Sequence, residues 1–424
     1  MEAALPGSWP PPSDSYYAEM RIFLEDVCSD LCLMRHATRD GSTLDAVRID
    51  REFHLGSPST FADMRVQPAA SPAYFLEVKV GYSNPVLIRH VLRKYGDNAT
   101  LANDCERLVL VVDTDRREDW PSVLASLKSG LHPKLTLEVW TEQTLRREIF
   151  ERLGVEFNSL TSHEDLLDVR ERLETALGYL AFGGDSLREY RNDPLRAELL
   201  WHLGAARLRS LQGDSRKSAR DILPPGIYRG VAVLMADLSS FSCFVRDTPD
   251  PEIIRESLTA FYSKSRYQVV NGGGMLYQFV GDAVIAFFGV PEADGCSIAN
   301  SLNVAQSLLD IGVSVSDHWQ RRIDRVQAMS GAHIGLTVGD VEILSLRPFS
   351  RTRIGAVSDS INMAARLLSA AEPGQIVVSN SFYHKLDEER QRQFAELAPL
   401  EAHNVGRVRA WKLDLSSRYQ RREA

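Results

Sequence analysis

Hydrophobic and polar positions alternate along the chain in three different ways. From about residue 17 to 158, strand-like runs such as AYFLEVKVG, RLVLVVDT and LTLEVW alternate with stretches of helical periodicity. This pattern predicts an α/β domain over 17–158. From 159 to 226 nearly all apolar residues recur at helical spacing, after a pattern at Ser162 and Asp165 that resembles a capping box. The second pattern predicts a helical linker over 159–226.

A third pattern begins after Pro224, Pro225 and Gly226, which punctuate the chain. Strand-like runs that include VAVLMADLSSF, MLYQFVG, AVIAFFG and SGAHIGLTVGDVEIL alternate with helical stretches in the order β-α-β-β-α-β-β-α-β. This order predicts an α+β domain over 227–415, with an antiparallel-rich sheet and its helices on one face. The two ends of the chain, 1–16 and 416–424, are interpreted as a disordered Pro-rich leader and a tail.

Composition narrows the class of protein. The 424 residues are enough for two or three domains, and the hydrophobic and charged fractions, 44% and 25%, are those of an ordinary globular protein. No run reaches the roughly 18 apolar residues of a membrane span, and the leader lacks the segments of a signal peptide. We therefore expect a cytoplasmic protein. The net charge of -8 gives no general attraction to nucleic acid.

The five cysteines, an odd number, argue against a disulfide framework and agree with a reducing compartment. Cys28 and Cys32 lie four residues apart on a predicted helix, where they could form half of a metal site. No His or Cys pair elsewhere in the sequence completes such a site. We therefore favour the interpretation that both are small buried apolar residues.

Two aspartates follow or interrupt predicted buried strands. Asp237 ends the run VLMAD just before a helix start, where free backbone N–H groups favour bound phosphate. Asp282 lies between MLYQFV and AVIAFF, at the tip of a predicted hairpin. Each alone is more typical of a helix N-cap or a turn residue. If the two strands are neighbours, however, both carboxylates meet at one edge of the sheet, which suits divalent metal ions and a nucleoside triphosphate.

Asn362 and Arg366 in the segment SDSINMAARL are further candidates for chemistry. They lie four residues apart, so both side chains project from one face of a predicted helix. Arg366 could cap the edge of a hydrophobic core. It could instead neutralise the charge that develops on a phosphate during displacement.

Together these motifs resemble the class III nucleotidyl cyclase catalytic domain. MADLSSFS, FVGDAVIAFFG, GAHIGLTVGDV and SDSINMAARLLSAAEPGQIVVS follow the family's order within 231–413. The resemblance implies a ferredoxin-like fold and a homodimer with active sites at its interface. It also implies that Asp237 and Asp282 of one subunit hold two Mg²⁺ or Mn²⁺ ions, while Asn362 and Arg366 come from the other. Phe241 would contact the substrate, and the products would be a 3′,5′-cyclic nucleotide and pyrophosphate.

The positions that select the base in this family depart from those of purine cyclases. The lysine of adenylate cyclases is Gln278 here, and their acid or threonine is Gly355. The glutamate and cysteine of guanylate cyclases are absent as well, and the bulky Tyr277 precedes Gln278. These departures resemble the Pycsar pyrimidine cyclases of bacterial antiphage defence. The resemblance implies cUMP or cCMP as product and a downstream effector that binds it. An adenylate cyclase that makes cAMP is the alternative.

The lysine with which the family holds the triphosphate corresponds to Val405 here. We expect Arg407 to supply the missing positive charge and to bind the substrate. Arg351 and Arg353 are alternatives, and each of the three is equally typical of an ordinary surface arginine.

The N-terminal region carries a second motif. In FADMRVQPAASPAYFLEVKVG, Asp63 precedes Glu77 and Lys79, which lie two residues apart and point to the same side of a strand. The motif resembles the PD-(D/E)xK nuclease core, in which the acids hold magnesium and the lysine activates water, and Glu25 fits the same fold. The resemblance implies a restriction-endonuclease-like domain over 17–158.

A solvated salt-bridged pair is the alternative interpretation of this motif. We therefore favour an inert sensory or regulatory domain over an active nuclease. The functional alternative that remains open is a metal-dependent nuclease regulated by a cyclase-like domain, and nucleic acid would then be its substrate.

Overall fold

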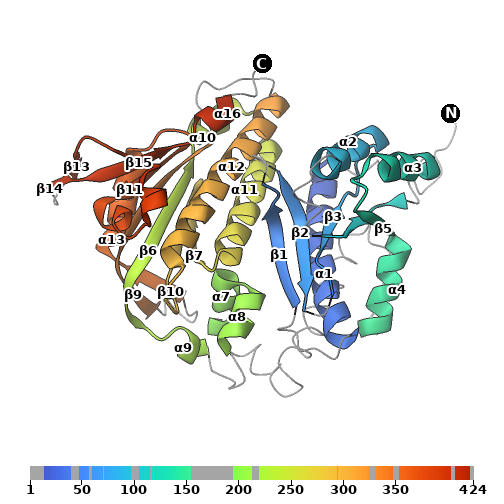
Figure 1. Ribbon diagram of the computed structural model, residues 1–424, viewed down its shortest axis with the longest axis horizontal. Coiled ribbons are helices and arrows are strands. Elements are labelled where there is room, and N and C mark those ends of the chain that lie inside the picture. The colour runs from blue at the N-terminus through green and yellow to red at the C-terminus, as the bar shows by residue number, and fades with distance from the viewer. Residues whose placement is uncertain are drawn as a thin grey trace, which may run out of the picture. The chain divides into compact units, whose positions relative to one another are not determined.

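The structure, a computed structural model, consists of two compact units (Figure 1). The N-terminal unit comprises 1–56 and 60–187, and the C-terminal unit comprises 57–59 and 188–424. The residues that the structure describes are 14–39, 47–56, 60–69, 71–96, 105–114, 117, 119–153, 194–212, 219–293, 295–323, 330–346, 353–402 and 406–420. Residues 1–13 of the predicted leader and most of the predicted linker lie outside these residues, and the domain boundaries at 158 and 226 stay predictions. Residues 14–16, predicted as the end of a disordered leader, are instead the first residues of a helix, Asp14–Arg39.

The N-terminal unit contains a five-stranded sheet in the order β1-β2-β3-β4-β5. The first three strands pair antiparallel, and β3, β4 and β5 pair parallel. Their bounds are β1 Val47–His54, β2 Phe61–Pro68, β3 Tyr74–Val78, β4 Arg107–Val111 and β5 Thr136–Trp140. The sequence pattern did not predict β1, because charged residues interrupt its apolar ones.

Helices cover both faces of this sheet. Their bounds are α1 Asp14–Arg39, α2 Asn84–Tyr95, α3 Trp120–Gly130 and α4 Glu142–Leu153. One buried cluster joins Leu24 of α1 and Ile149 of α4 to Leu76 of the central strand β3. A second cluster joins Leu87 of α2 and Leu127 of α3 to the other side of the sheet. The α/β prediction for this region is therefore confirmed. Cys28 and Cys32 are buried free thiols in the first cluster, as expected.

The C-terminal unit contains a larger sheet in the order β12-β15-β11-β9-β6-β8-β7, with β10 paired to β9. Among the described residues, β9 and β11 form the only parallel pair of this sheet, and its other pairs are antiparallel. The bounds are β6 Gly226–Leu238, β7 Met275–Val280, β8 Ala283–Phe288, β9 Ala332–Leu346, β10 Arg353–Val357, β11 Gln375–Ser379, β12 Ala395–Glu396 and β15 Ala410–Asp414. A separate small hairpin pairs β13, Leu400–Ala402, with β14, Gly406–Val408. The antiparallel-rich sheet is therefore confirmed.

The helices of this unit lie on both faces of the sheet, so the prediction of helices on one face is wrong. Gly312 of α12 packs against Ala332 of β9, whereas Gly335 of β9 packs against the backbone of α13 at Ala364. Residues 332 and 335 point to opposite faces because side chains alternate along a strand. The bounds are α10 Phe241–Asp247, α11 Pro251–Asn271, α12 Ser297–Ile323, α13 Asp359–Ser369, α14 Asn380–Tyr383, α15 Glu388–Gln391 and α16 Ser417–Gln420. The strands are apolar on both faces, which permits this double cover.

Three further helices precede β6 and belong to the same unit. They are α7 Pro194–Leu203, α8 Ala205–Gln212 and α9 Ala219–Ile222. Leu199, Leu203 and Leu208 join the buried cluster that also contains Val233 and Phe287 of the sheet. The last part of the predicted linker is therefore integrated into the C-terminal unit.

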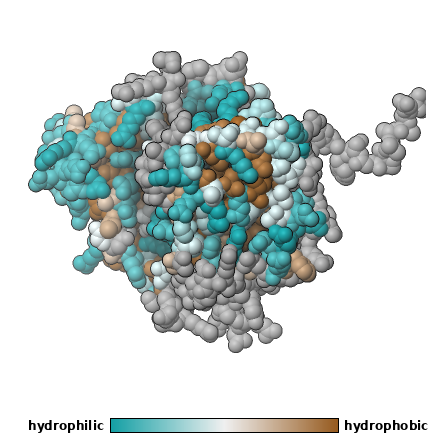
Figure 2. All heavy atoms as spheres, turned by 45° about the vertical axis from the view of Figure 1, so that its right-hand side comes forward, coloured by the Kyte–Doolittle hydropathy of each residue, from teal (hydrophilic) through white to brown (hydrophobic). Residues whose placement is uncertain are grey.

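The surface is mainly hydrophilic on the face drawn in Figure 2, where hydrophobic residues show as separate brown areas. Among the described residues, a few large apolar side chains remain substantially exposed, including Ile227, Val280 and Val357. No helix in the described part of the chain is both long enough and apolar enough to span a bilayer.

Candidate functional site

Asp237 lies near the carboxyl end of β6, an interior strand of the C-terminal sheet between β9 and β8. Its neighbours in register are Ala283 of β8 and His333 of β9. The preceding residues Val231 to Leu234 are fully buried, whereas 29% of the Asp237 side chain is exposed. The apolar strand therefore anchors a carboxylate that reaches solvent at its end.

Asp282 lies in the two-residue turn that joins β7 to β8, so the predicted hairpin is confirmed. Gly281 in this turn has a φ of 60°, a left-handed conformation that glycine adopts without strain. The Tyr262 hydroxyl of α11 donates to the Gly281 carbonyl, and the Tyr262 ring stacks on Phe279 with centroids 4.1 Å apart. These contacts fix the direction of the turn and hence of Asp282.

The carboxyl groups of Asp237 and Asp282 lie within hydrogen-bonding reach of each other. Burial, and then the negative charge of Asp237, raise the pKa of Asp282 to about 6. Burial also raises the pKa of Asp237. Two carboxyl groups this close share a proton unless a cation lies between them. The site therefore has a deficit of positive charge.

His333 and Ser239 complete the surroundings of this pair, and the sequence motifs did not identify either as a site residue. The His333 Nε2 atom lies 3.8 Å from Asp237 Oδ2, and its Nδ1 atom is 3.0 Å from the Ser239 hydroxyl. Burial lowers the pKa of His333, so the imidazole is mainly neutral near pH 7. Knowing that β9 pairs with β6 would have revealed His333, because it lies directly opposite Asp237.

The aspartate pair fits divalent cations of the magnesium type. Mg²⁺ is usually bound by one or two carboxylates together with waters and substrate phosphates. The described residues contain no group of three or more His, Cys, Asp or Glu side chains that could hold a metal ion alone. The deficit of positive charge at Asp237 and Asp282 is what a cation would relieve, and a substrate would supply the remaining oxygen ligands.

The three candidate base-selecting residues lie on β7 and β10. Leu276 pairs with Ala286 and Gln278 with Ile285, so Tyr277 is the extra residue of a β-bulge, which re-aims its side chain. The Tyr277 ring stacks on Phe287 at 4.9 Å. Its hydroxyl accepts the backbone N–H of Ala356 at 3.1 Å, next to the third candidate, Gly355. The bulge therefore brings the two strands of this candidate site into direct contact.

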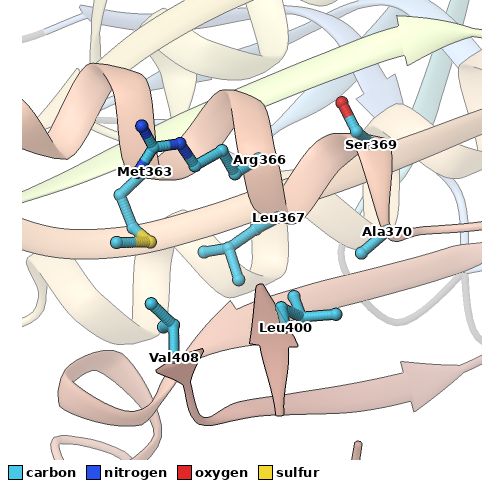
Figure 3. Close-up of a pocket in the computed structure, with 7 residues that line it drawn as sticks. All are labelled: Met363, Arg366, Leu367, Ser369, Ala370, Leu400 and Val408. Atoms are coloured by element: carbon cyan, nitrogen blue, oxygen red, sulfur yellow. The ribbon is translucent and has the colours of Figure 1, made fainter. Parts of the chain in front are cut away.

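Asn362 and Arg366 both lie on α13, as predicted, with Asn362 exposed and Arg366 partly buried. Ser358 caps this helix by accepting the Ser360 N–H at 2.9 Å. Figure 3 shows α13 facing the β13–β14 hairpin across a pocket of about 180 Å³. It is lined by Met363, Arg366, Leu367, Ser369, Ala370, Leu400 and Val408. Arg366 is thus placed at an opening of the protein surface.

The remaining predicted substrate residues are more scattered. Phe241 is 8% exposed and packs against the rings of Phe244 and Trp319. Arg407 is exposed on β14, and Arg353 pairs with Glu198 of α7. Val405 and Arg351 lie outside the described residues. Roles of Phe241 and Arg407 in substrate binding stay predictions.

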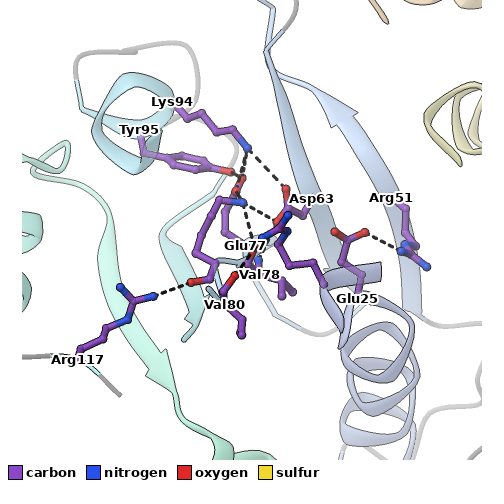
Figure 4. A network of polar contacts seen from close by, with 11 residues as sticks. Glu25, Arg51, Asp63, Glu77, Val78, Val80, Lys94, Tyr95 and Arg117 are labelled. Atoms are coloured by element: carbon purple, nitrogen blue, oxygen red, sulfur yellow. Dashed lines mark hydrogen bonds and ion pairs between the residues drawn. The ribbon is translucent and has the colours of Figure 1, made fainter. Parts of the chain in front are cut away.

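In the N-terminal unit, Asp63, Glu77 and Lys79 do come together. Figure 4 shows the two acids of this cluster with Lys94 beside them. Lys79 Nζ lies 2.8 Å from Asp63 Oδ2 and 2.5 Å from Glu77 Oε2. Glu25 lies close by on α1 and pairs with Arg51 at 2.8 Å. Burial, and then the charge of Asp63, raise the pKa of Glu25 to about 7.

This N-terminal cluster is already neutralised by the protein itself. Lys94 of α2 lies 2.8 Å from Glu77 Oε2 and 3.6 Å from Asp63 Oδ1. The Tyr95 hydroxyl donates to Glu77 Oε1 at 2.5 Å. Burial would raise the pKa of Asp63, but the ion pairs with Lys79 and Lys94 outweigh it and hold that pKa well below its usual range. Two ammonium groups thus balance two carboxylates, so the cluster does not fit a divalent cation.

Comparison with known protein families finds a match in the C-terminal unit. Residues 224–413 match the family model described as the adenylate and guanylate cyclase catalytic domain. The uncharacterized protein Rv1318c of Mycobacterium tuberculosis is 24% identical over 172 residues, which cover 40% of this chain and 30% of that protein. The receptor-type guanylate cyclase gcy-8 of Caenorhabditis elegans is 25% identical over 161 residues, or 38% of this chain and 13% of that protein.

Among solved structures, the guanylyl cyclase Cya2 has a TM-score of 0.40 and 19% sequence identity, covering 45% of this chain and 93% of that one. The segment of the chain that matches Rv1318c spans less than a third of the length of that protein. The family match covers β6 to β15, which include the aspartate pair and α13. Residues 224–413 therefore form a catalytic domain of the class III adenylate and guanylate cyclase family.

Proposed function

We propose that the protein converts a pyrimidine nucleoside triphosphate to its 3′,5′-cyclic nucleotide and pyrophosphate. The observation that carries this proposal is the aspartate pair at the end of β6 and in the β7–β8 turn. Its carboxyl groups lie side by side, partly exposed, with a raised pKa at each. Such a pair suits cations that accompany a triphosphate.

The proposed reaction is a displacement at the α-phosphorus. The ribose 3′-oxygen forms the new P–O bond, the bond to the β-phosphate breaks, and the 3′-hydroxyl proton leaves to solvent. Divalent cations held by Asp237 and Asp282 would lower the pKa of the attacking hydroxyl and offset charge on the leaving pyrophosphate. Arg366 would stabilise charge on the α-phosphate, and Asn362 would orient the ribose.

We further propose that a homodimer builds the site, with Arg366 and Asn362 contributed by the second copy. A two-fold interface would place each subunit's α13 opposite the other subunit's aspartate pair and form two equivalent sites. The exposed apolar residues Val280, beside the turn, and Val357, before α13, support a contact at these two places.

A pyrimidine base is favoured by the arrangement around Tyr277. Its ring is held by Phe287 on one side and by the Ala356 N–H at its hydroxyl, so it occupies space beside Gln278 and Gly355. A fixed ring at this position favours the smaller base. The Gln278 amide both donates and accepts, so it suits uracil and cytosine equally. A role in antiphage defence is supported by the resemblance to the Pycsar cyclases.

The test of catalysis compares wild type with Asp237→Asn and Asp282→Asn. Each protein is incubated with UTP, CTP, ATP or GTP and Mn²⁺, and cyclic products are measured by mass spectrometry. Asp340→Asn is the matched control, because Asp340 is an exposed aspartate on β9 of the same domain. We expect loss of product in the first two variants only. Undiminished product in Asp237→Asn would overturn the proposed site.

The test of the dimer mixes two inactive variants, Asp237→Asn and Arg366→Ala. If the site is shared between copies, each heterodimer keeps one intact site, and an equal mixture recovers roughly a quarter of the wild-type rate. If one chain supplies all four groups, the mixture stays inactive. That result would refute the shared site and leave the cyclase chemistry standing.

A further inference from the structure

Helix α7 packs directly on the two strands that carry the candidate base-selecting residues. Its Leu195, Leu199 and Leu203 share one buried cluster with Met275 of β7 and Ile354 of β10. Tyr277 and Ala356 are packed against the same cluster. Helix α7 therefore lies on the same face of the sheet as the side chains of Tyr277 and Ala356.

His202 ties α7 to the β-bulge of β7. Its Nδ1 atom lies 2.5 Å from the carbonyl oxygen of Leu276, the residue that immediately precedes Tyr277. A carbonyl only accepts, so Nδ1 carries the hydrogen and donates it. The histidine is 4% exposed, and burial lowers its pKa, which favours this neutral form. A bulge removes regular pairing from the strand, so an outside donor is needed to fix the carbonyl direction.

Glu198, one turn earlier on α7, ties the helix to β10. Its Oε1 atom lies 2.5 Å from Arg353 Nη1, and Arg353 is two residues before Gly355. The other carboxylate oxygen, Oε2, lies 3.6 Å from His202 Nε2. Glu198 therefore pairs with Arg353 of β10 and lies beside His202 without a hydrogen bond to it, because the neutral imidazole has no hydrogen on Nε2.

A third contact fixes the end of α7 against the hairpin. The Trp201 carbonyl accepts the Nε–H of Arg266 from α11 at 3.0 Å. The Trp201 ring meets Phe279 of β7 edge-on, with centroids 6.1 Å apart. The last turn of α7 is thus held by a neighbouring helix as well as by β7, so it forms a firm support.

We propose that His202 and Glu198 are positioning residues for nucleotide selection, which hold the Tyr277 bulge and the Gly355 strand at a fixed separation. The proposal rests on the proposed cyclase function. The contacts of His202 and Glu198 are with β7 and β10 and not with the aspartate pair. We therefore expect both residues to affect which base binds, through the positions of Tyr277 and Gly355. Loosening them would widen the base site and leave the displacement chemistry in place.

The experiment measures steady-state kinetics of the full chain with UTP, CTP, ATP and GTP in the presence of Mn²⁺. For His202→Ala we expect KM for the preferred pyrimidine triphosphate to rise about tenfold, the size of one lost buried hydrogen bond, with kcat changed by less than about threefold. The preference for pyrimidine over purine should fall by a similar factor. His384→Ala, at an exposed histidine of the same unit, is the control.

Two further variants keep the proposal testable if His202→Ala folds poorly. The Nδ2–H group of asparagine can replace the donor on His202 Nδ1, so His202→Asn should restore most of the selectivity. Glu198→Gln removes the charge that pairs with Arg353 of β10, and it should also reduce the preference for pyrimidine over purine triphosphates. Thermal unfolding, measured for every variant, identifies those that are folded.

Two results separate failure of this proposal from failure of the proposed function. If the wild type forms no cyclic nucleotide, the function itself is wrong. If the wild type is active but folded His202→Ala and Glu198→Gln keep its KM and its nucleotide preference, the positioning role alone is overturned. A loss of kcat that is equal for every nucleotide and is not rescued by His202→Asn also overturns it.

Discussion

Replacing Asp282 by asparagine should stabilise the metal-free protein at neutral pH while abolishing turnover. In the folded chain Asp282 has a pKa of about 6, against an ordinary value of 3.8, because it is partly buried beside Asp237. The folded state thus binds this proton more tightly than the unfolded chain does. The resulting contribution to stability is fully present below about pH 4 and is lost as the pH rises through about 6.

The size of the effect follows from that difference. About two pH units correspond to roughly 3 kcal/mol as an upper bound. The aspartate is only half-buried, so solvent screening reduces the expected effect to roughly 1 kcal/mol. Asparagine keeps the shape and cannot ionise. Asp282→Asn should therefore raise the free energy of unfolding by about 1 kcal/mol at pH 7.5 and change it little at pH 4.

The assay is urea denaturation with a chelator present, followed by circular dichroism at both pH values. Asp414→Asn serves as a control of opposite sign. Hydrogen bonds from the Ser416 hydroxyl and backbone lower the pKa of Asp414, so its charged form is stabilising near neutral pH. Asp414 also lies in the C-terminal unit, so the unfolding transition that Asp414→Asn shifts is the one that belongs to this unit. A less stable Asp282→Asn at pH 7.5, or an equal gain at pH 4, would refute the reasoning.

Substitutions at three further positions test other parts of the molecule. Arg366→Ala should lower kcat by about two to three orders of magnitude with little change in thermal stability, and an unchanged kcat would exclude its role at the transition state. Lys94→Gln should destabilise the N-terminal unit by about 3 kcal/mol, because Glu77 is fully buried and loses a counter-charge; an unchanged unfolding temperature would contradict this. Tyr277→Phe should lower the free energy of unfolding by about 1 kcal/mol, because it leaves the Ala356 N–H without its acceptor. Tyr277→Ala should allow the protein to form cyclic purine nucleotides in the product assay.

The sequence predicted the C-terminal unit well because its strands are long, strongly apolar and separated by clear breaks. The hairpin around Gly281 and Asp282 needs only local information, since two apolar runs and a turn pair define it. The order of the main strands and helices from Val231 to Ser379 follows from the same signals, whereas the short elements after Ser379 are not part of the predicted order. The resemblance then assigned the domain, and the family match over 224–413 agrees with it.

What the sequence did not predict depends on long-range pairing. The double cover of the sheet follows from strands that are apolar on both sides, which a period-two pattern does not reveal. His333 becomes a neighbour of Asp237 only through the β6–β9 register. The β-bulge at Tyr277 and the contact of His202 with the Leu276 carbonyl likewise depend on structure far from each residue in the chain.

The N-terminal motif shows how the surroundings of a motif affect its charge balance. Asp63, Glu77 and Lys79 gather as the pattern indicated, but Lys94 from a later helix supplies a second ammonium group. Its presence at the cluster could not be read from the strand motif. The nuclease-like assignment of this unit stays a prediction.

The most direct measurement of the central claim is the identity of the product. The full chain is incubated with an equimolar mixture of UTP, CTP, ATP and GTP and with Mn²⁺, and the products are resolved by mass spectrometry against 3′,5′- and 2′,3′-cyclic standards. We predict a 3′,5′-cyclic pyrimidine nucleotide with an equimolar amount of pyrophosphate. A cyclic purine as the main product would contradict the assigned base, and the absence of every cyclic nucleotide would contradict the account as a whole.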